Sequence, residues 1–241
     1  MQPDRTPPVV SILPQVGCVL LIFLIIGLGF LSLVFGGMQT ALEKLHFSPS
    51  GATLTIFAII VGSMINLPLM RVRRDVEQAT ASGIWQVRQQ WVPMMRRSQL
   101  ETIIAVNVGG CIIPLLIAVF EGTYVRSHSS QAILALVISA AINIAICHAI
   151  ARPVPGVGIV MPAFLPPLAA IGCAWILLWS DRYDDVRAPV AFIAGVLGPL
   201  VGADLLNFRH FERISAGVLS IGGAGSFDAI VISGLLAAFF V

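Results

Sequence analysis

The feature that most constrains this chain is a series of long apolar runs. Runs of roughly 18 or more apolar residues recur along the sequence, and each is long enough to cross the ~30 Å hydrocarbon core of a bilayer. Hydrophobic residues make up 57% of the chain and charged residues 11%, whereas soluble domains carry about 25% charged residues. Buried strands of a soluble protein end after about 4–8 residues, so they do not explain these runs. We therefore expect an integral membrane protein.

The runs predict an all-α membrane fold of about seven transmembrane helices with segments broken by proline and glycine. We expect the proline-rich residues 1–15 to form a flexible N-terminal tail and residues 16–241 to form a single polytopic membrane domain. The first apolar run is longer than a signal-peptide core of about 7–15 residues, so we interpret it as the first membrane helix. The predicted helices span residues 16–35, 53–70, 102–121, 131–150, 158–179, 188–207 and 216–241.

One connection, residues 71–101, is much longer than the others and combines arginines with Trp85 and Trp91. Alternation of apolar and polar residues around 84–92 favours a short hairpin turning at Ser82-Gly83. An amphipathic helix lying in the interface is the alternative. With either structure, we expect an interfacial loop on the cytoplasmic surface.

The arginines also predict the orientation, because cytoplasmic loops carry an excess of basic residues. If residues 71–101 are cytoplasmic, ten of the 14 basic residues lie inside and four lie outside. The N-terminus is then cytoplasmic, the C-terminus lies outside, and the protein is a multi-pass protein of the inner (plasma) membrane. The four outer residues are Lys44, Arg126, Arg182 and Arg187.

Two acidic residues, Asp204 and Asp228, fall within predicted membrane segments. An acid at the centre of a bilayer costs roughly 2.5–3.5 kcal/mol on insertion scales, so such residues mark functional sites. Two carboxylates that share a site hold one proton between them, so one serves as general base and the other as general acid. The sequence thus indicates a catalytic pair. A packing role for either residue is the alternative.

The predicted depths of the two aspartates do not match. At 1.5 Å per residue, Asp204 lies about 24 Å along a helix that runs inward, which places it close to the cytoplasmic side. Asp228 lies about 18 Å along the next helix, which runs outward, so it is about 18 Å deep from that same side. The difference becomes smaller if the glycine-rich stretch from Ile221 to Gly225 is unwound, which its composition permits.

Several residues are expected to line the cavity of such a site. Asn207 lies one turn from Asp204, and the remaining candidates are glycines or residues at helix breaks: Gly222, Gly223, Gly225, Pro162 and Asn107. Five prolines between Arg152 and Pro167 predict that this stretch is not a regular helix. The four cysteines show no metal-ligand spacing, and we expect neither a metal nor another cofactor.

Several stretches resemble a bacterial and archaeal family of polytopic membrane proteins, catalogued as domain of unknown function 1614. The similarity extends from about residue 48 onward, and the family supplies no established activity. The matching stretches are Gly62-Ser-Met-Ile-Asn-Leu-Pro68, Ala105-Val-Asn-Val-Gly-Gly110, Ala151-Arg-Pro-Val-Pro-Gly-Val-Gly158, Gly202-Ala-Asp-Leu-Leu-Asn207 and Ser220-Ile-Gly-Gly-Ala-Gly-Ser-Phe-Asp228.

The layout is also distantly similar to the GxGD intramembrane aspartyl proteases. Those enzymes carry one aspartate on an inward-running helix and one on the next, outward-running helix, as Asp204 and Asp228 do here. The glycine motif before Asp228 reads GxGxxD, which is two residues longer, and Ala203 stands where the family has a tyrosine. Pro162-Ala163-Phe164-Leu165 resembles that family's PAL motif but precedes the aspartates.

Three functions remain open at this point. A di-aspartate hydrolase would act on a membrane-embedded peptide, whereas a transporter would use the aspartates as a proton or cation site for a small ion or solute. A non-catalytic membrane scaffold is the third. The expected partner is the lipid bilayer, and a net charge of +2 gives no indication of nucleic-acid binding.

Overall fold

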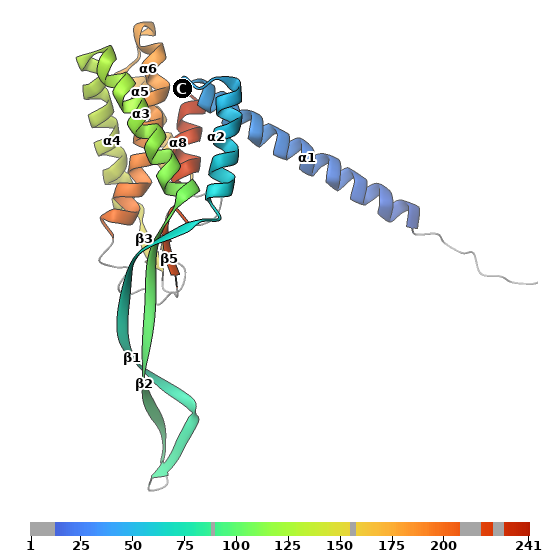
Figure 1. The fold of residues 1–241 in the computed structure, drawn as a ribbon, viewed down its shortest axis with the longest axis vertical. Coiled ribbons are helices and arrows are strands. Elements are labelled where there is room, and N and C mark those ends of the chain that lie inside the picture. Colours follow the sequence, from blue (N-terminus) through green and yellow to red (C-terminus); the bar gives the residue numbers. More distant parts are fainter. Residues whose placement is uncertain (1–12, 88–89, 155–157, 208–217, 224–228) are drawn as a thin grey trace, which may run out of the picture. The chain divides into compact units, whose positions relative to one another are not determined.

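The computed structural model describes residues 13–87, 90–154, 158–207, 218–223 and 229–241 (Figure 1). The chain divides into two compact units, Met1–Gly37 and Met38–Val241. Helix α1, Leu13–Glu43, begins in the first unit and ends in the second. The stretch from Val19 to Leu33 exposes apolar side chains on all sides, which is the pattern of a helix surrounded by lipid.

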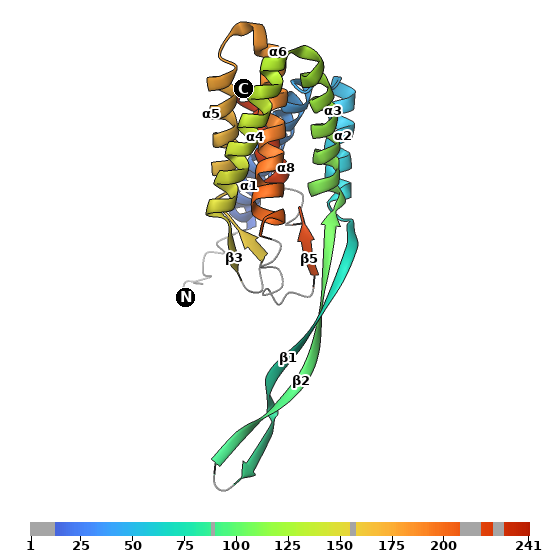
Figure 2. The ribbon, with the colours of Figure 1, turned by 90° about the vertical axis from the view of Figure 1, so that its left-hand side faces the viewer.

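The second unit is a bundle of helices that alternate in direction (Figures 1 and 2). Helix α6 is the central helix, and its residues from Val186 to Val196 are buried against α3, α4, α5 and α8. Phe192 is among the largest of its fully buried side chains. The helices are α2 Pro49–Gly62, α3 Ile113–His128, α4 Ser130–Ile150, α5 Leu165–Leu177, α6 Asp184–Leu197 and α8 Ala229–Phe239.

Several helices start at residues that suit a helix N-terminus. The Ser48 hydroxyl accepts a hydrogen bond from Gly51 N (3.2 Å), and Pro49 follows as the first residue of α2. Ser129 caps α4 in the same way through Ala132 N (3.1 Å). A short 3-10 helix, η2 Asp181–Tyr183, leads into α6.

Two helices contain π-helical turns at one end of the bundle. The π-helix η1, Val108–Ile112, precedes α3, and the π-helix η3, Gly198–Leu205, continues α6. π-Helical turns are rare in proteins, and those that occur often lie at functional sites. Both lie at the end of the bundle where the strands are found (Figures 1 and 2).

Strands form a second kind of element at that end. Strand β1, Asn66–Val87, pairs antiparallel with β2, Gln90–Asn107, and β2 pairs parallel with β5, Val218–Ile221. The sheet order is β1-β2-β5. A separate pair consists of β3, Arg152–Val154, and β4, Gly158–Val160.

These strands correct the expectation of an all-α fold. The predicted helices at 53–70, 158–179 and 216–241 are shorter than expected, because residues 66–70, 158–160 and 218–221 are strand. The helix predicted at 102–121 starts and ends later, at Val108 and His128, because residues 102–107 are strand. The hairpin is also much longer than predicted. Its register pairs Val87 with Gln90, so the strands turn there and not at Ser82-Gly83. The expectation that Arg152 to Pro167 is not a regular helix is confirmed, because α5 begins only at Leu165.

Among the described residues, four helical segments are long and apolar enough to cross a membrane: Gly17–Glu43, Val108–His128, Ser130–Ile150 and Asp181–Leu205. Helices α2, α5 and α8 are apolar but shorter. Large apolar side chains on several helices point away from the bundle, which is the surface that a bilayer would cover. They include Leu54, Phe57, Leu116, Phe120, Leu134 and Ile176.

Candidate functional site

A hydrogen-bonded network joins three separate segments at the strand end of the bundle. Asn107 is fully buried, and its Nδ2 donates to the Ser63 carbonyl (2.7 Å) and to Asn66 Oδ1 (3.1 Å). Its Oδ1 accepts from Gly110 N (2.7 Å), so the same side chain caps η1. Ser220 Oγ on β5 donates to Asn66 Oδ1 (2.5 Å). The network therefore connects the ends of α2 and β1 to the start of α3 and to β5.

Two glycines, Gly109 and Gly110, bring these segments into backbone contact. A Cβ built on Gly109 would stand 2.0 Å from the Ile59 carbonyl oxygen, and one on Gly110 would stand 1.9 Å from the Gly222 carbonyl oxygen. Gly222 also adopts φ +70°, a conformation that side chains disfavour. A residue with a side chain cannot occupy either position without moving the backbone.

A further segment at this end is η3, which carries Asp204. Gly198 and Gly202 place η3 directly against α4, where a Cβ on Gly202 would stand 2.3 Å from the Ile144 carbonyl oxygen. Asn143 is fully buried on α4, and its Nδ2 donates to the Ala194 carbonyl (2.8 Å). This contact fixes the junction where α6 becomes η3.

Asn207 follows η3 and is buried. Its Nδ2 donates to the Gly202 carbonyl (3.1 Å) and lies 3.4 Å from His148 Nδ1. These bonds hold the chain that leaves η3 against the end of α4. Asp204 is half-buried in the last turn of η3, and it is also in contact with other groups.

The predicted site residues divide into four groups. Asn107, Gly222 and Gly223 belong to the network and glycine contacts, whereas Asn207 lies near Asp204 on the other side. Pro162 is exposed at the same end, just before α5. Gly225 and Asp228 lie outside the described residues, so the aspartate pair stays a prediction.

One buried acid, Glu121 at the opposite end of the bundle, was not predicted from the sequence. Glu121 was expected at a helix end, but α3 continues to His128 and Glu121 is fully buried. Its Oε2 lies 3.1 Å from His46 Nδ1. The signal in the sequence was the apolar Val125 one turn later, which keeps the buried face of the helix continuous past Glu121.

The described residues contain neither a cluster of metal ligands nor a disulfide. Within the described part of the chain, no three His, Cys, Asp or Glu side chains gather closely enough to hold a metal ion. Cys18, Cys111, Cys147 and Cys173 are free thiols, and Cys111 and Cys147 are buried as small apolar side chains.

An apolar helical bundle with four helical segments long and apolar enough to cross a membrane indicates a membrane protein. A model of the family described as protein of unknown function (DUF1614) matches residues 60–240, and the chain belongs to this family. The matched region includes the hairpin, both π-helices and α8, whereas α1 precedes it. Neither the curated proteins nor the solved structures gave a match to the chain.

Proposed function

We propose that the protein is a multi-pass protein of the inner membrane that hydrolyses peptide bonds at a site formed by Asp204 and Asp228. The site lies at the strand end of the bundle, and that end faces the cytoplasm. The proposal rests on the arrangement of η3 and α8, on the positions of the arginines and on the chemistry of paired carboxylates.

The observation that carries the proposal is the start of α8. The first described residue of this helix is Ala229, directly after Asp228, and α8 packs against both η3 and η1. Asp204 lies in the last turn of η3 at the same end. Ile221 is strand and Gly222 has a positive φ, so the glycine-rich stretch begins as an unwound segment. This arrangement supports similar depths for the two aspartates.

The arginines support a cytoplasmic location for this end. Arg71 on β1 and Arg152 on β3 belong to elements at the strand end. Arg126 and Arg182 lie on elements of the opposite end, together with the acidic residues of the α5–α6 connection. An excess of basic residues on one side predicts that this side is cytoplasmic.

Hydrolysis needs one ionised and one protonated carboxyl group. The ionised aspartate takes a proton from a water molecule, whose oxygen then bonds to the carbonyl carbon of the peptide. The protonated aspartate donates its proton to the carbonyl oxygen. The C–N bond then breaks: the nitrogen takes the proton from the aspartic acid formed in the first step, and one hydroxyl of the gem-diol gives its proton to the other aspartate. The products are a carboxylic acid and an amine, and the dyad again holds one proton. No oxidant, metal or cofactor enters this balance.

A disulfide experiment tests whether the two side chains meet. In a chain without native cysteines, we expect Asp204→Cys with Asp228→Cys to form a disulfide on mild oxidation, because disulfides join Cα atoms about 4.4–6.8 Å apart. Leu205→Cys with Asp228→Cys is the matched control, because Leu205 is the next residue and is exposed. If neither oxidation nor a bifunctional reagent of about 10 Å joins positions 204 and 228, the pair does not exist.

An activity experiment tests the reaction itself. The purified protein is placed in liposomes with a transmembrane peptide that carries a fluorophore at one end and a quencher at the other. We expect a rise in fluorescence that Asp204→Asn and Asp228→Asn each abolish while the protein stays folded. Cleavage that continues in both variants would exclude the mechanism.

A transporter is the second candidate, and the broken helices favour it. Irregular backbone at membrane depth occurs where it is buried in protein or lines a water-filled cavity, and transporters bind their substrates at such breaks. The same liposomes discriminate the two functions. Proton or cation flux that depends on Asp204, without peptide cleavage, would replace the hydrolase by a transporter.

A further inference from the structure

Glu121 is the most deeply buried acid among the described residues. It lies on α3 within a membrane-length segment, and its side chain has no exposed surface. Its Oε1 accepts no hydrogen bond from any described residue, although an interior carboxyl oxygen normally has a partner. A charged group in a membrane segment is costly unless it is paired or holds a proton. One of the two carboxyl oxygens is therefore without a hydrogen-bond partner among the described residues.

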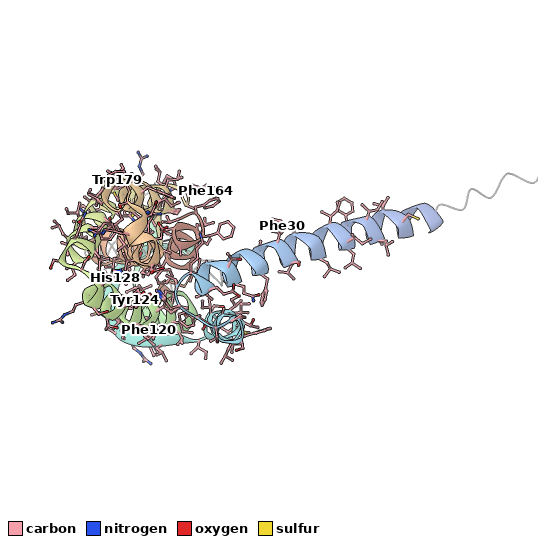
Figure 3. The ribbon with its side chains drawn as sticks, turned by 90° about the horizontal axis from the view of Figure 1, so that it is seen from above. Phe30, Phe120, Tyr124, His128, Phe164 and Trp179 are labelled. Carbon is pink, nitrogen blue, oxygen red and sulfur yellow. The ribbon has the colours of Figure 1, made fainter. Side chains whose placement is uncertain are left out.

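His46 connects this carboxyl group to the surface. Its Nδ1 lies 3.1 Å from Glu121 Oε2, and a third of its side chain is exposed. Its ring contacts the Tyr124 ring, with centroids 3.9 Å apart and the planes tilted by 41°. Tyr124 in turn lies beside His128 near the end of α3 (Figure 3). A histidine ring has two nitrogens, so it can accept a proton on its exposed side and share one with a partner on its buried side.

The backbone at His46 supports a specific role for this residue. Among the described residues it is the one with a positive φ that is not glycine, at 62°. This left-handed conformation is disfavoured for a residue with a side chain. Asparagine or glycine would suit the turn better, yet histidine occupies the position and points its ring at Glu121.

Other charged groups near this end already have partners or lie on other elements. Lys44 Nζ donates to the Phe239 carbonyl (2.7 Å), and Arg187 on α6 is paired with Asp184 (2.8 Å). Helices α2 and α8, which also pack on α3, contain no titratable side chain. The remaining titratable groups on packed elements are Cys111 on η1, Cys147 and His148 near the far end of α4, and the exposed Asp185 on α6. Tyr124, Arg126 and His128 lie on α3 itself, and the exposed Glu43 ends α1, three residues before His46.

We propose that Glu121 and His46 form a proton-binding site that exchanges protons with the medium on the side of the membrane opposite to Asp204. The proton resides on the buried carboxyl group or on the imidazole, and it enters through the exposed edge of His46. The exchange moves a single proton between water, His46 and Glu121: one O–H or N–H bond breaks as another forms, and no bond between heavy atoms changes. The site is independent of the proposed hydrolysis.

Infrared difference spectroscopy at two pH values tests the proposal on the intact protein in liposomes. We expect a carbonyl band of a protonated carboxylic acid that appears or disappears with pH and is absent in Glu121→Gln. Gln keeps the shape of the side chain and carries no exchangeable charge. Glu43→Gln is the matched control, because Glu43 is exposed and its carboxylate accepts a hydrogen bond from Gln39 Nε2 (3.0 Å). A band that persists in Glu121→Gln would overturn the proposal.

A second variant keeps the test valid if Glu121→Gln does not fold. His46→Asn is chosen because asparagine tolerates a positive φ. We expect it to displace the midpoint of the carbonyl band by about one pH unit or more, since a partner within about 4–6 Å changes the titration of a carboxyl group by this amount. An unchanged midpoint would show that His46 is not part of the site.

The side of entry is tested by changing the pH on one face of oriented liposomes. We expect the band to respond at once when the pH changes on the face that carries His46, and slowly when it changes on the Asp204 face. The reverse order would refute the assigned side while leaving the hydrolase proposal untouched.

Discussion

The backbone of Gly110 lies against the carbonyl group of Gly222, so that a Cβ on Gly110 would stand 1.9 Å from the Gly222 oxygen. The two residues belong to segments that are far apart in the sequence: Gly110 lies in η1 and Gly222 follows β5. Their contact, together with the Asn66, Asn107 and Ser220 hydrogen bonds, attaches the C-terminal strand to the rest of the bundle.

We expect Gly110→Ala to lower the free energy of unfolding by about 3 kcal/mol or more, because the added methyl group forces the two backbones apart. Gly122→Ala is the matched control on the same helix: its added Cβ meets no atom within 4 Å. That change should leave stability equal or raise it by up to about 1 kcal/mol. Unfolding in detergent, followed by circular dichroism, measures both. Equal stability of the two variants would contradict the close contact.

Asn107→Ala should lower the free energy of unfolding by about 2–4 kcal/mol, because it leaves the Gly110 N–H and the Ser63 carbonyl without their partner. The control is Thr123→Ala, an exposed position whose hydroxyl bonds only locally to the Phe120 carbonyl. It should change stability by no more than about 0.5 kcal/mol. Similar thermal midpoints for the two variants would show that the network contributes little.

Arg187→Lys should weaken the turn between α5 and α6. The guanidinium group donates to the carbonyls of Leu178 (2.8 Å) and Ser180 (3.3 Å), pairs with Asp184 (2.8 Å) and lies 4.3 Å from the centroid of the Trp175 ring. Lysine cannot supply this planar fork, so we expect a loss of about 1–3 kcal/mol.

The control for that change is Arg182→Lys, because Arg182 is exposed in the same connection. It should be neutral within about 0.5 kcal/mol. Trp175 fluorescence would report the local change, since the ring loses its stacked partner. A spectrum unaltered in Arg187→Lys would argue against the stacked geometry.

The proposed orientation predicts which cysteines an impermeant maleimide reaches in intact cells. After Cys18 and Cys173 are replaced, Asp185→Cys should be labelled from outside and Arg71→Cys only after the membrane is opened. Both positions are exposed in the structure. The reason is the excess of basic residues around the hairpin. Labelling of Arg71→Cys in intact cells would reverse the topology.

Some elements could be predicted from the sequence alone because the reason for them is local. Helix α4 was expected at residues 131–150 and spans Ser130–Ile150, since one uninterrupted apolar run between a serine cap and Pro153 leaves little choice. The break between Arg152 and Leu165 was predictable for a similar reason, because proline lacks the N–H group that a helix needs.

Other elements were decided only by tertiary structure. Apolar residues such as Ile103 and Ile104 suit a helix and a strand equally well. They form strand because they pair with Arg71 and Met70 of β1 on one side. On the other side they pair with Val218 and Leu219 of β5. The partner lies more than a hundred residues away along the chain in the case of β5, so no local pattern contains this information.

The candidate residues show the same division. The sequence by itself identified Asn107 and Gly222 as residues at helix breaks, because amide side chains and glycines within apolar segments are conspicuous. Only the tertiary structure brought their segments together, through the Asn66 and Ser220 bonds and the contact of Gly222 with Gly110. Burial of Glu121 was likewise decided by the neighbouring helices, since an acid near a helix end is exposed or buried according to what packs against it.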